Sequence, residues 1–485
     1  MRGSRKFQAA SGAALILALA TTPSGAETLR EAMLRAYQTN PTLTGARAGQ
    51  RSIDENVAIE KADGRPNARS SADYTEYVNR PSVFTPRRNV SANAQVNVPL
   101  YSGGAVRNAI NAAKLRVQAG QNDLRGTESS VFARVVAAYM DVIRDSAIVT
   151  FNRQNVVSLE TNFRASNDRF EVGDVTRTDV AQSDSRLALA RADLQTAEAQ
   201  LIASKENYIA LVGVSPDNLQ TPPPLPGLPA TPEAAVAVAL TDNPDILAAN
   251  KARDAAHYDV KVAKAQAAPR VSAFARGDYV DYLGSEKGVS TFPSTNPTAK
   301  DASVGVSVTL PLYQGGRPGA LARQGVARES QAIEDQVRVE RDVISQTRSA
   351  YASWQASLHT IESTRSAVSS TSLSLEGVRA ENSAGTRTIL DILNAEQEAV
   401  NARVQLVVAE RNAYVAAFSL LAAMGHAEAR DLNLDGGALY DPQINYKRVN
   451  DKWFDFDFDG TPQATATRTV DSPTQNAILN GASKP

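Results

Sequence analysis

The sequence predicts an α+β membrane protein with two similar halves, each built from a pair of strands and very long helices. The first observation is a repeated motif, Pro-Leu-Tyr-x-Gly-Gly, at residues 99–104 and again 212 positions later. The second is a heptad pattern of apolar residues after each motif, from 105 to 170 and from 319 to 380. The third is an aromatic content of only 6%, which suits helices packed closely side by side.

Further matches extend the repeat along the chain. Ala138-Tyr139 matches Ala350-Tyr351 at the offset of 212, and Asn40-Pro41 matches Asn243-Pro244 at an offset of 203. Several matches at consistent offsets indicate a duplicated unit of about two hundred residues, longer than the usual solenoid repeat. The predicted organisation is a signal peptide (1–26), a first repeat (27–213), a Pro-rich linker (214–230), a second repeat (231–425) and a C-terminal segment (426–485).

The first 26 residues have the three parts of a secretory signal peptide. Basic residues precede an apolar run at 9–20, and Ser24-Gly25-Ala26 supplies the small residues of a cleavage site. An uncleaved membrane anchor is the alternative, but it needs a longer apolar run. We predict no membrane-spanning helix after this segment, so the mature chain can cross a membrane only with strands in a closed barrel.

The charge balance and the absent motifs narrow the functional classes. Lys and Arg number 51 against 52 Asp and Glu, so no basic excess is present to follow a nucleic-acid backbone. The three histidines, His257, His359 and His426, fall on different predicted elements, which argues against a shared metal site. With no phosphate-binding loop, nucleophile elbow or paired-His motif, we predict no enzyme, no cofactor and no metal.

The elements of the first half follow in order. A helix is predicted over 28–62 with a break at Asn40-Pro41, then strands over 70–78 and 90–98 with a loop at 80–89, and then helices over 105–170 and 178–211. Because proline cannot donate to a strand ladder and glycine permits a sharp bend, each repeated motif predicts a corner from strand to helix. The corner residues are Pro99, Tyr101, Gly103 and Gly104 in the first half and Pro311, Tyr313, Gly315 and Gly316 in the second.

The second half repeats this order, with a helix over 231–265, strands over 271–282 and 303–313, and a long helix over 319–380. Its polar loop at 284–300 is longer than the loop at 80–89, which explains the difference between the two offsets. All four predicted strands are close to the length that crosses a bilayer when tilted.

The turns at Gly173 and Gly385 carry charged residues at equivalent places. In one chain these are ordinary solvated charges near a hairpin tip; in copies arranged around an axis they form rings at the end of a tube. Their placement at both equivalent turns favours a function. The candidates are Asp179, Arg387, Asp391 and Asn394.

Residues 453–460 form an unusual Trp-Phe-Asp-Phe-Asp-Phe-Asp-Gly run. Asp455, Asp457 and Asp459 resemble the start of a calcium loop, but Ala466 stands where that loop needs a bidentate Glu. The alternation of Phe and Asp fits an edge segment with one wet face equally well. The Thr, Ser, Pro and Ala composition of the remaining tail predicts disorder.

The duplicated halves, the twin corners and the run Gly-Thr-Arg-Thr-Ile-Leu-Asp-Ile-Leu-Asn-Ala at 385–395 resemble the TolC family of outer-membrane efflux proteins, over about residues 27–425. The resemblance implies a homotrimer in the outer membrane of a Gram-negative cell, with a twelve-stranded barrel in the lipid and a helical coiled-coil tunnel in the periplasm. Four strands cannot close a barrel alone, whereas three copies can. It also implies the passive exit duct of efflux or type I secretion, served by a periplasmic adaptor (membrane fusion protein) and an inner-membrane ABC or proton-driven pump.

The resemblance also gives roles to the turns, which would form the periplasmic entrance. Arg387 and Asp179 match a pair that helps to hold the family's entrance helices shut, and Asp391 matches an acidic ring at the constriction. The chain departs from the family pattern at Asn394, where an Asp is usual, and at Asn382, where a Tyr is usual, so fewer closing contacts are expected. The cargo, protein or small toxic compounds, stays open. The alternative is a non-conducting periplasmic coiled-coil adaptor or scaffold, although adaptors lack duplicated strand pairs of barrel length.

Overall fold

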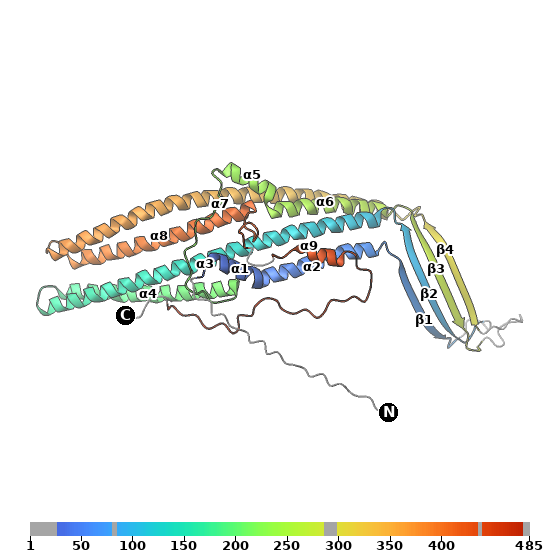
Figure 1. Cartoon of the computed structure of the whole chain (residues 1–485), viewed down its shortest axis with the longest axis horizontal. Helices are drawn as coiled ribbons and strands as arrows, with labels where there is room; N and C mark the ends of the chain where they lie inside the picture. The colour runs from blue at the N-terminus through green and yellow to red at the C-terminus, as the bar shows by residue number, and fades with distance from the viewer. Residues whose placement is uncertain (1–26, 80–84, 286–297, 435–438, 479–485) are drawn as a thin grey trace, which may run out of the picture.

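The computed structural model describes residues 27–79, 85–285, 298–434 and 439–478. The predicted signal peptide and parts of the loops 80–89 and 284–300 lie outside these ranges. The molecule is an elongated rod in which helices run side by side over most of the length, and a four-stranded sheet occupies one end (Figure 1).

The two halves contain the same elements in the same order. Corresponding helices have equal lengths of 11, 22, 67 and 36 residues, so the predicted duplication is confirmed. The first half contains α1 (Leu29–Thr39), α2 (Pro41–Ala62), β1 (Asn67–Glu76), β2 (Arg88–Tyr101), α3 (Ala105–Glu171) and α4 (Arg177–Val212). The second contains α5 (Pro232–Asp242), α6 (Pro244–Ala265), β3 (Arg270–Asp281), β4 (Thr298–Thr309), α7 (Arg317–Ser383) and α8 (Ile389–Met424), and α9 (Pro442–Val449) follows.

The four strands form one antiparallel sheet in the order β1-β2-β3-β4, so the two halves join through β2 and β3. Strands of 10 to 14 residues, tilted by about 45°, rise about 24 to 33 Å, which matches the apolar band of about 25 Å in membrane-spanning barrels. The outer edges of β1 and β4 have no strand partner among the described residues of the chain. These edges leave backbone groups free to pair with strands of neighbouring copies, and three copies of a four-stranded sheet would supply the twelve strands of a closed barrel.

The strand ends differ from the sequence prediction. Pro99 does not end its strand, because β2 continues to Tyr101 through an irregularity in its register with β3. A bulge accommodates the missing N–H of proline without ending the pairing. In the second half β4 stops at Thr309, before Pro311 and Tyr313, and it begins at Thr298 instead of 303. The glycines of both corners do adopt positive φ angles, between +60° and +84°.

An Asn-Pro pair kinks the helix at the front of each half. The Asn40 side chain accepts a hydrogen bond from the Thr42 N–H at 2.9 Å and donates to the Leu211 carbonyl at the end of α4 at 2.8 Å. Asn243 does the same in the second half, donating to the Ala423 carbonyl near the end of α8 at 2.9 Å. Each kink is therefore a helix N-cap that also holds the end of the long hairpin above it.

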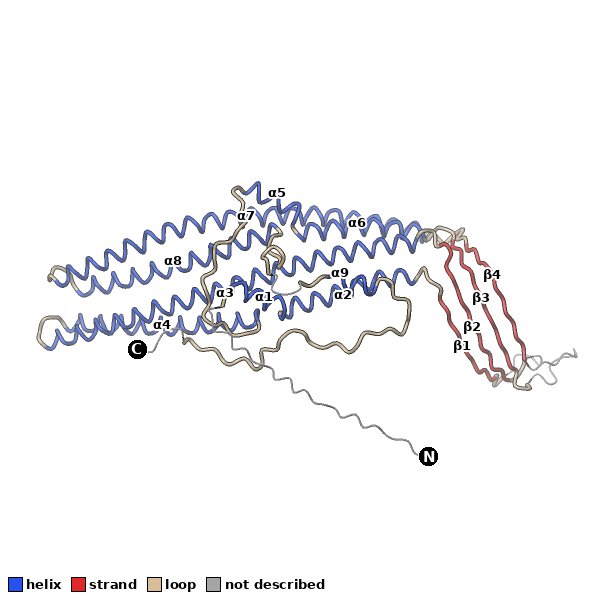
Figure 2. Tube along the Cα trace, in the orientation of Figure 1, coloured by secondary structure: helices blue, strands red, loops and turns tan. Residues whose placement is uncertain are grey.

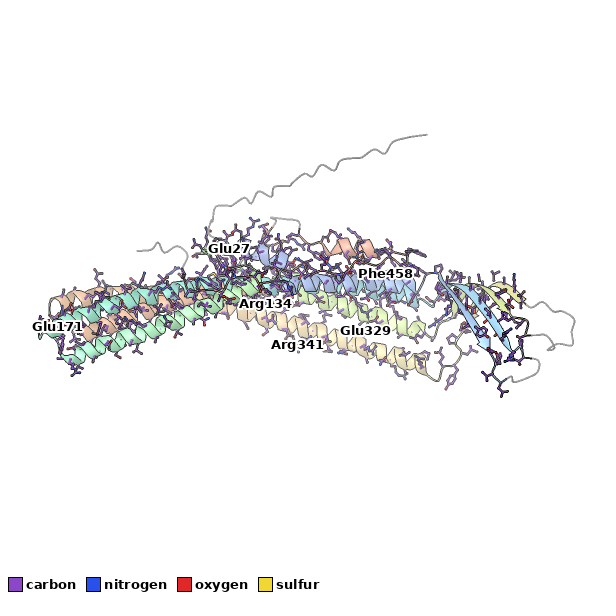
Figure 3. All side chains as sticks on the ribbon, turned by 90° about the horizontal axis from the view of Figure 1, so that it is seen from below. Glu27, Arg134, Glu171, Glu329, Arg341 and Phe458 are labelled. Atoms are coloured by element: carbon purple, nitrogen blue, oxygen red, sulfur yellow. The ribbon has the colours of Figure 1, made fainter. Side chains whose placement is uncertain are left out.

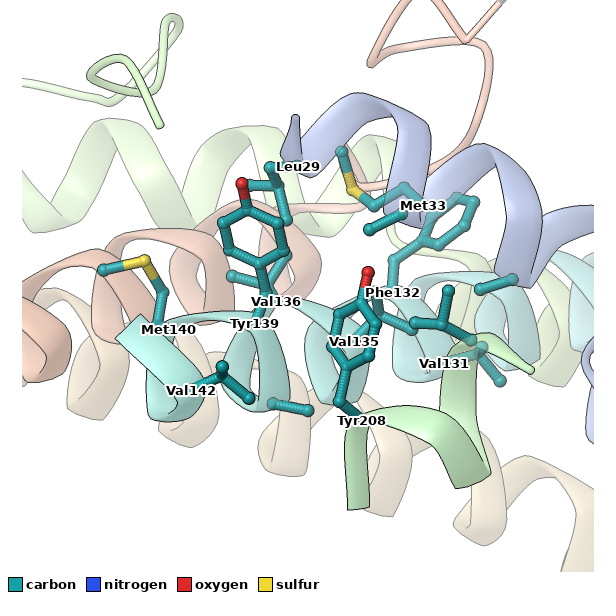
Figure 4. Packing of buried hydrophobic residues seen from close by; sticks show 14 of the residues in the cluster. Leu29, Met33, Val131, Phe132, Val135, Val136, Tyr139, Met140, Val142 and Tyr208 are labelled. Atoms are coloured by element: carbon teal, nitrogen blue, oxygen red, sulfur yellow. The ribbon is translucent and has the colours of Figure 1, made fainter. Parts of the chain in front are cut away.

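The main apolar core lies midway along the rod, where α1 packs on α3 and α4 (Figure 4). Phe132, Tyr139 and Tyr208 are fully buried there. The Tyr139 hydroxyl lies 2.7 Å from the carbonyl oxygens of Glu27 and Gln220, and its twin Tyr351 donates to the Ala230 carbonyl at 2.7 Å. Tyr139 thus binds the first part of the linker that joins the halves, and Tyr351 binds its last residue.

The two 67-residue helices differ in burial. α3 is buried along much of its length, whereas α7 buries only Val343 and Thr347. The seam residues Val142, Val149 and Val156 are buried, but their counterparts in α7, such as Trp354 and Ile361, are half-buried. An apolar seam left half-covered in one chain fits helices that are completed by neighbouring copies.

α8 corrects one expectation. By length and composition it is the one helix within the described ranges that is apolar enough to cross a membrane, although no such helix was expected after residue 26. Its apolar face is rich in alanine, and it packs along α7 and α3 in the helical part of the rod. Close helix packing therefore explains its composition.

A half-buried carboxyl group in the middle of the rod predicts a pH dependence of stability. Burial raises the pKa of Glu128 in α3 to about 7, although the Ala429 N–H donates to its carboxylate. Because the folded-state pKa exceeds the ordinary 4.5, the folded protein binds this proton more tightly, and stability rises as pH falls from about 7 to 4.5. We expect the free energy of unfolding to be about 2–3 kcal/mol higher near pH 5 than above pH 7. Circular dichroism of the detergent-solubilised protein measures this; a Glu128→Gln variant with an undiminished pH dependence would contradict the assignment.

Candidate functional site

The hairpins α3/α4 and α7/α8 end together at the tip of the rod, farthest from the sheet (Figure 1). Glu171, the last residue of α3, marks this end in Figure 3. Gly173 and Gly385 adopt φ angles of +80° and +78° at the two turns, in open surroundings. Glycine is required there by the backbone conformation, not by packing.

Two candidate acidic residues, Asp179 and Asp391, begin α4 and α8 through identical capping boxes. The Asp179 carboxylate accepts hydrogen bonds from the Thr176 hydroxyl at 2.7 Å and the Thr176 N–H at 2.9 Å, and Asp391 does the same with Thr388. The hydrogen bond from the threonine hydroxyl, and to a lesser degree that from the backbone N–H, hold the pKa of both carboxyl groups below the usual range. Both carboxylates therefore stay charged at the two turns, where they cap the first turns of their helices.

Arg387 makes its contacts within its own hairpin. Its Nε donates to Glu381 Oε2 at 2.8 Å, and the Asn382 amide donates to the Arg387 carbonyl at 2.7 Å. Asp179 belongs to the other hairpin and is bonded to Thr176. The described residues of one chain do not pair Arg387 with Asp179, and this pairing stays a prediction.

Asn394 connects the two hairpins of one chain. Its side-chain oxygen accepts a hydrogen bond from Arg186 Nη2 in α4 at 2.9 Å. Of the four candidate residues at the turns, Asn394 is therefore the one that the structure places in a contact between hairpins.

Glu396, in the second turn of α8, is a site residue that the sequence analysis missed. Its carboxylate is only 4% exposed and accepts hydrogen bonds from Arg379 Nη2 at 2.6 Å, Ser158 Oγ at 2.8 Å and Asn162 Nδ2 at 3.0 Å. Arg379 belongs to α7, whereas Ser158 and Asn162 belong to α3. One buried carboxylate thus joins three helices from both hairpins.

Leu393 adds an apolar contact beside this carboxylate. It is 1% exposed and packs in a cluster with Val156 and Leu159 of α3 and with Leu187 and Ala190 of α4. Together, Leu393, Asn394 and Glu396 dock α8 against the other hairpin, and we call these three residues the latch.

Each hairpin is also held together internally. Arg191 pairs with Glu160 at 2.7 Å between α4 and α3, and Arg365 pairs with Glu410 at 3.2 Å between α7 and α8. The next charged contact between the hairpins is that of Arg411 with Asp141 at 2.8 Å, about 20 Å farther along α8. Within each hairpin, therefore, an ion pair joins the two helices, and the latch lies closer to the tip than the Arg411–Asp141 contact between the hairpins.

A signal for Glu396 was present in the sequence. It lies between the apolar positions Leu393 and Ala399, at the spacing of the buried stripe of a helix. A carboxylate in such a stripe is seldom fully buried without partners. The partners themselves lie 234 and 238 residues away in α3, a distance that no local pattern bridges.

Both halves of the chain are similar in sequence to known outer-membrane proteins. The model of the family described as "Outer membrane efflux protein" matches residues 33–214 and 235–426, one segment in each half. The chain is 35% identical to the outer membrane efflux protein BepC of Brucella suis over 448 residues, which cover 91% of this chain and 95% of BepC. It is 26% identical to the outer membrane protein TolC of Escherichia coli, over 94% of this chain and 90% of TolC.

The fold is similar to that of a solved structure, the outer membrane protein VceC of Vibrio cholerae. The TM-score is 0.69 at 22% identity, and the match covers 82% of this chain and 96% of VceC.

Proposed function

The chain belongs to the outer membrane efflux protein family, and from this premise we propose that its latch holds the periplasmic end of an outer-membrane exit duct closed. The protein is a channel of the Gram-negative outer membrane, and its helices extend into the periplasm. Family members are transport channels, so we assign no catalytic role. Because the chain belongs to this family of channels, the alternative of a non-conducting adaptor or scaffold no longer applies.

The observation that carries the proposal is the buried Glu396 carboxylate, because it joins α7 and α8 to α3 where the helices end. Losing these contacts leaves a buried carboxylate without partners, which disfavours partial opening. A latch of this kind gives two distinct states, closed with the hairpins docked and open with them apart.

Opening requires a partner that favours the undocked state. A passive duct has no energy source of its own, and a ligand shifts an equilibrium only by binding one state better. We propose that three copies form the duct, that a periplasmic adaptor binds the open tip, and that an inner-membrane pump of the ABC or proton-driven type supplies the energy. Since BepC is named an efflux protein, small compounds are the preferred cargo, with protein secretion as the second candidate.

The test is the single-channel conductance of the purified mature protein in a planar bilayer, with its mass measured in detergent. We expect a trimer with a small, steady conductance that is set by the closed tip. A monomer, or a trimer with a large conductance at rest, would contradict a latched duct.

Replacement of Arg387 by Ala tests the contact between copies at the entrance. We expect a higher resting conductance, because the exposed guanidinium near each turn would no longer pair across the assembly. The effect should be smaller than that of a latch variant, since an exposed ion pair contributes about 1 kcal/mol or less. Arg177→Ala, an exposed arginine at the other turn, is the matched control. Equal conductance in the two variants would remove Arg387 from the closing contacts.

A further inference from the structure

Four exposed aromatic side chains follow α9, where the chain has no further repeat. Trp453, Phe454, Phe456 and Phe458 are between 67% and 79% exposed. The rings of Phe454 and Phe456 lie 5.8 Å apart, and those of Phe456 and Phe458 lie 6.4 Å apart, both edge to face. We call residues 453–458 the aromatic segment. A group of neighbouring exposed apolar rings, rimmed by charges, marks a site of interaction.

The acidic residues between these rings are paired within the chain. Asp457 accepts from Lys452 Nζ at 2.8 Å, and Asp459 forms a two-bonded pair with Arg448 at 2.7 and 2.9 Å. The pKa of Asp459 lies below its usual range because Arg448 donates to it. Two of the three carboxylates that a calcium site would need are therefore already paired with basic side chains. The same pairs leave little net charge beside the aromatic rings.

Trp453, the first residue of the aromatic segment, is held at the boundary between the helices and the sheet. The Arg65 guanidinium lies over the Trp453 ring, 4.4 Å from its centre, and Arg65 Nη1 donates to the Lys452 carbonyl at 2.5 Å. Lys61 binds the neighbouring Asn450 carbonyl and the Asp451 carboxylate at 3.1 and 3.0 Å. Arg65 precedes the first residue of β1 by two positions, which is about 7 Å of chain at most.

The figures show the same placement. In Figure 2 the loop after α9 reaches the end of α2, next to β1, before it turns back along the rod. Figure 3 labels Phe458 on the outer side of the helices, toward the end that carries the sheet. Beyond it, residues 461–478 follow an extended path back along the rod, although their composition predicts disorder. They contact α4, where Lys205 donates to the carbonyls of Asn476 and Ile478.

Other aromatic residues mark the same level of the molecule. Tyr101 and Tyr313, at the corners between strand and helix, are 53% and 88% exposed. Tyrosine and tryptophan concentrate where a membrane protein passes from hydrocarbon to water. Because the strands cross the outer membrane, the periplasmic headgroups lie where β1 begins, and Trp453 lies at that place.

We propose that the aromatic segment is an interfacial anchor, which inserts its rings into the periplasmic leaflet of the outer membrane beside the barrel. The proposal rests on the membrane location assigned above. Trp453 and the three Phe rings enter the boundary between acyl chains and headgroups, while Arg65, Arg448 and Lys452 remain at the level of the lipid phosphates. The contact fixes the height of the tunnel relative to the bilayer from outside the barrel.

Fluorescence tests the anchor directly, because the chain has only two tryptophans, Trp354 and Trp453. The Trp354→Phe variant leaves Trp453 as the one emitter. The full mature trimer is placed in phosphatidylethanolamine vesicles that contain phosphatidylcholine brominated near the headgroup end of its acyl chains. We expect the emission of Trp453 to lose a large share of its intensity relative to vesicles without bromine.

The Trp453→Phe variant is the matched control, since Trp354 lies about 55 Å along α7 from its junction with the sheet. Its emission should not change with brominated lipid. The variant F454S/F456S/F458S in the Trp354→Phe background should show weaker quenching of Trp453 while the trimer persists.

Equal, weak quenching of both tryptophans would overturn the anchor. If Trp453 emission is also insensitive to lipid but shifts when the trimer dissociates, a neighbouring copy covers the segment instead. Conductance measured on the same preparation separates the two proposals. A conducting trimer without quenching rejects only the anchor, whereas quenching without conductance rejects only the duct.

Discussion

Replacement of Glu396 by Ala is expected to raise the resting conductance of the channel well above that of the unchanged protein. The substitution removes the acceptor for Arg379, Ser158 and Asn162 at once. Hydrogen bonds to a charged group contribute roughly 1.5–3 kcal/mol each, but Arg379 is half-exposed and recovers water, so we expect a net loss of about 2 kcal/mol per chain. This corresponds to a shift of roughly thirtyfold toward the open state.

Two variants on the same helix serve as controls. Glu398→Ala removes the same charge from an exposed position two residues away and should leave the conductance unchanged. Glu396→Gln keeps the shape and one acceptor oxygen and should give an intermediate value. Identical conductance for the Ala variants at 396 and 398 would show that the buried carboxylate does not hold the tip closed.

Replacement of Leu393 by Ala should open the tip through packing. Leu393 is almost fully buried between α3 and α4, so truncation leaves a cavity in the contact between hairpins. Such a change costs about 2–3 kcal/mol when the site cannot collapse, and less if the helices move together. The measurement is again the resting conductance, together with the rate of proteolysis at the turn that contains Gly385.

Leu390→Ala is the control, because Leu390 lies one turn earlier on α8 and is 37% exposed. It should have a clearly smaller effect on both readouts. A variant at 393 that lowers the unfolding temperature but leaves conductance at the level of the 390 variant would assign Leu393 to folding alone.

The sequence predicted most of the fold because the same set of helices and strands occurs in both halves of the chain. A heptad seam and an Asn-Pro kink that recur at consistent offsets are local patterns, and each predicts its own element. The strand ends were less accurate, since Pro99 is accommodated by a bulge, a feature that depends on the partner strand. Helix α9 was missed because its eight residues carry too few apolar positions to give a period.

The candidate site was predicted only in part. The turns were found through Gly173 and Gly385, whose positive φ angles leave a clear mark on the sequence. The latch was not, because Glu396 finds its partners on α3 and α7 through tertiary packing. Residue identity at a turn thus predicts where the chain bends, whereas the identity of the contact that holds the bend in place requires the structure.

The twin tyrosines that bind the linker have a mechanical consequence. Because Tyr139 and Tyr351 bind residues at both ends of the linker between the halves, we expect the helices to pivot about the middle of the rod when the tip moves. From Arg411 to the start of α8, the lever arm is about 33 Å, so a rotation of about 10° displaces the tip by about 6 Å. If the tips of three copies rotated together in this way, the opening between them would widen with little strain in the rest of the rod. The position at which the tyrosines bind the linker would then set the width of that opening.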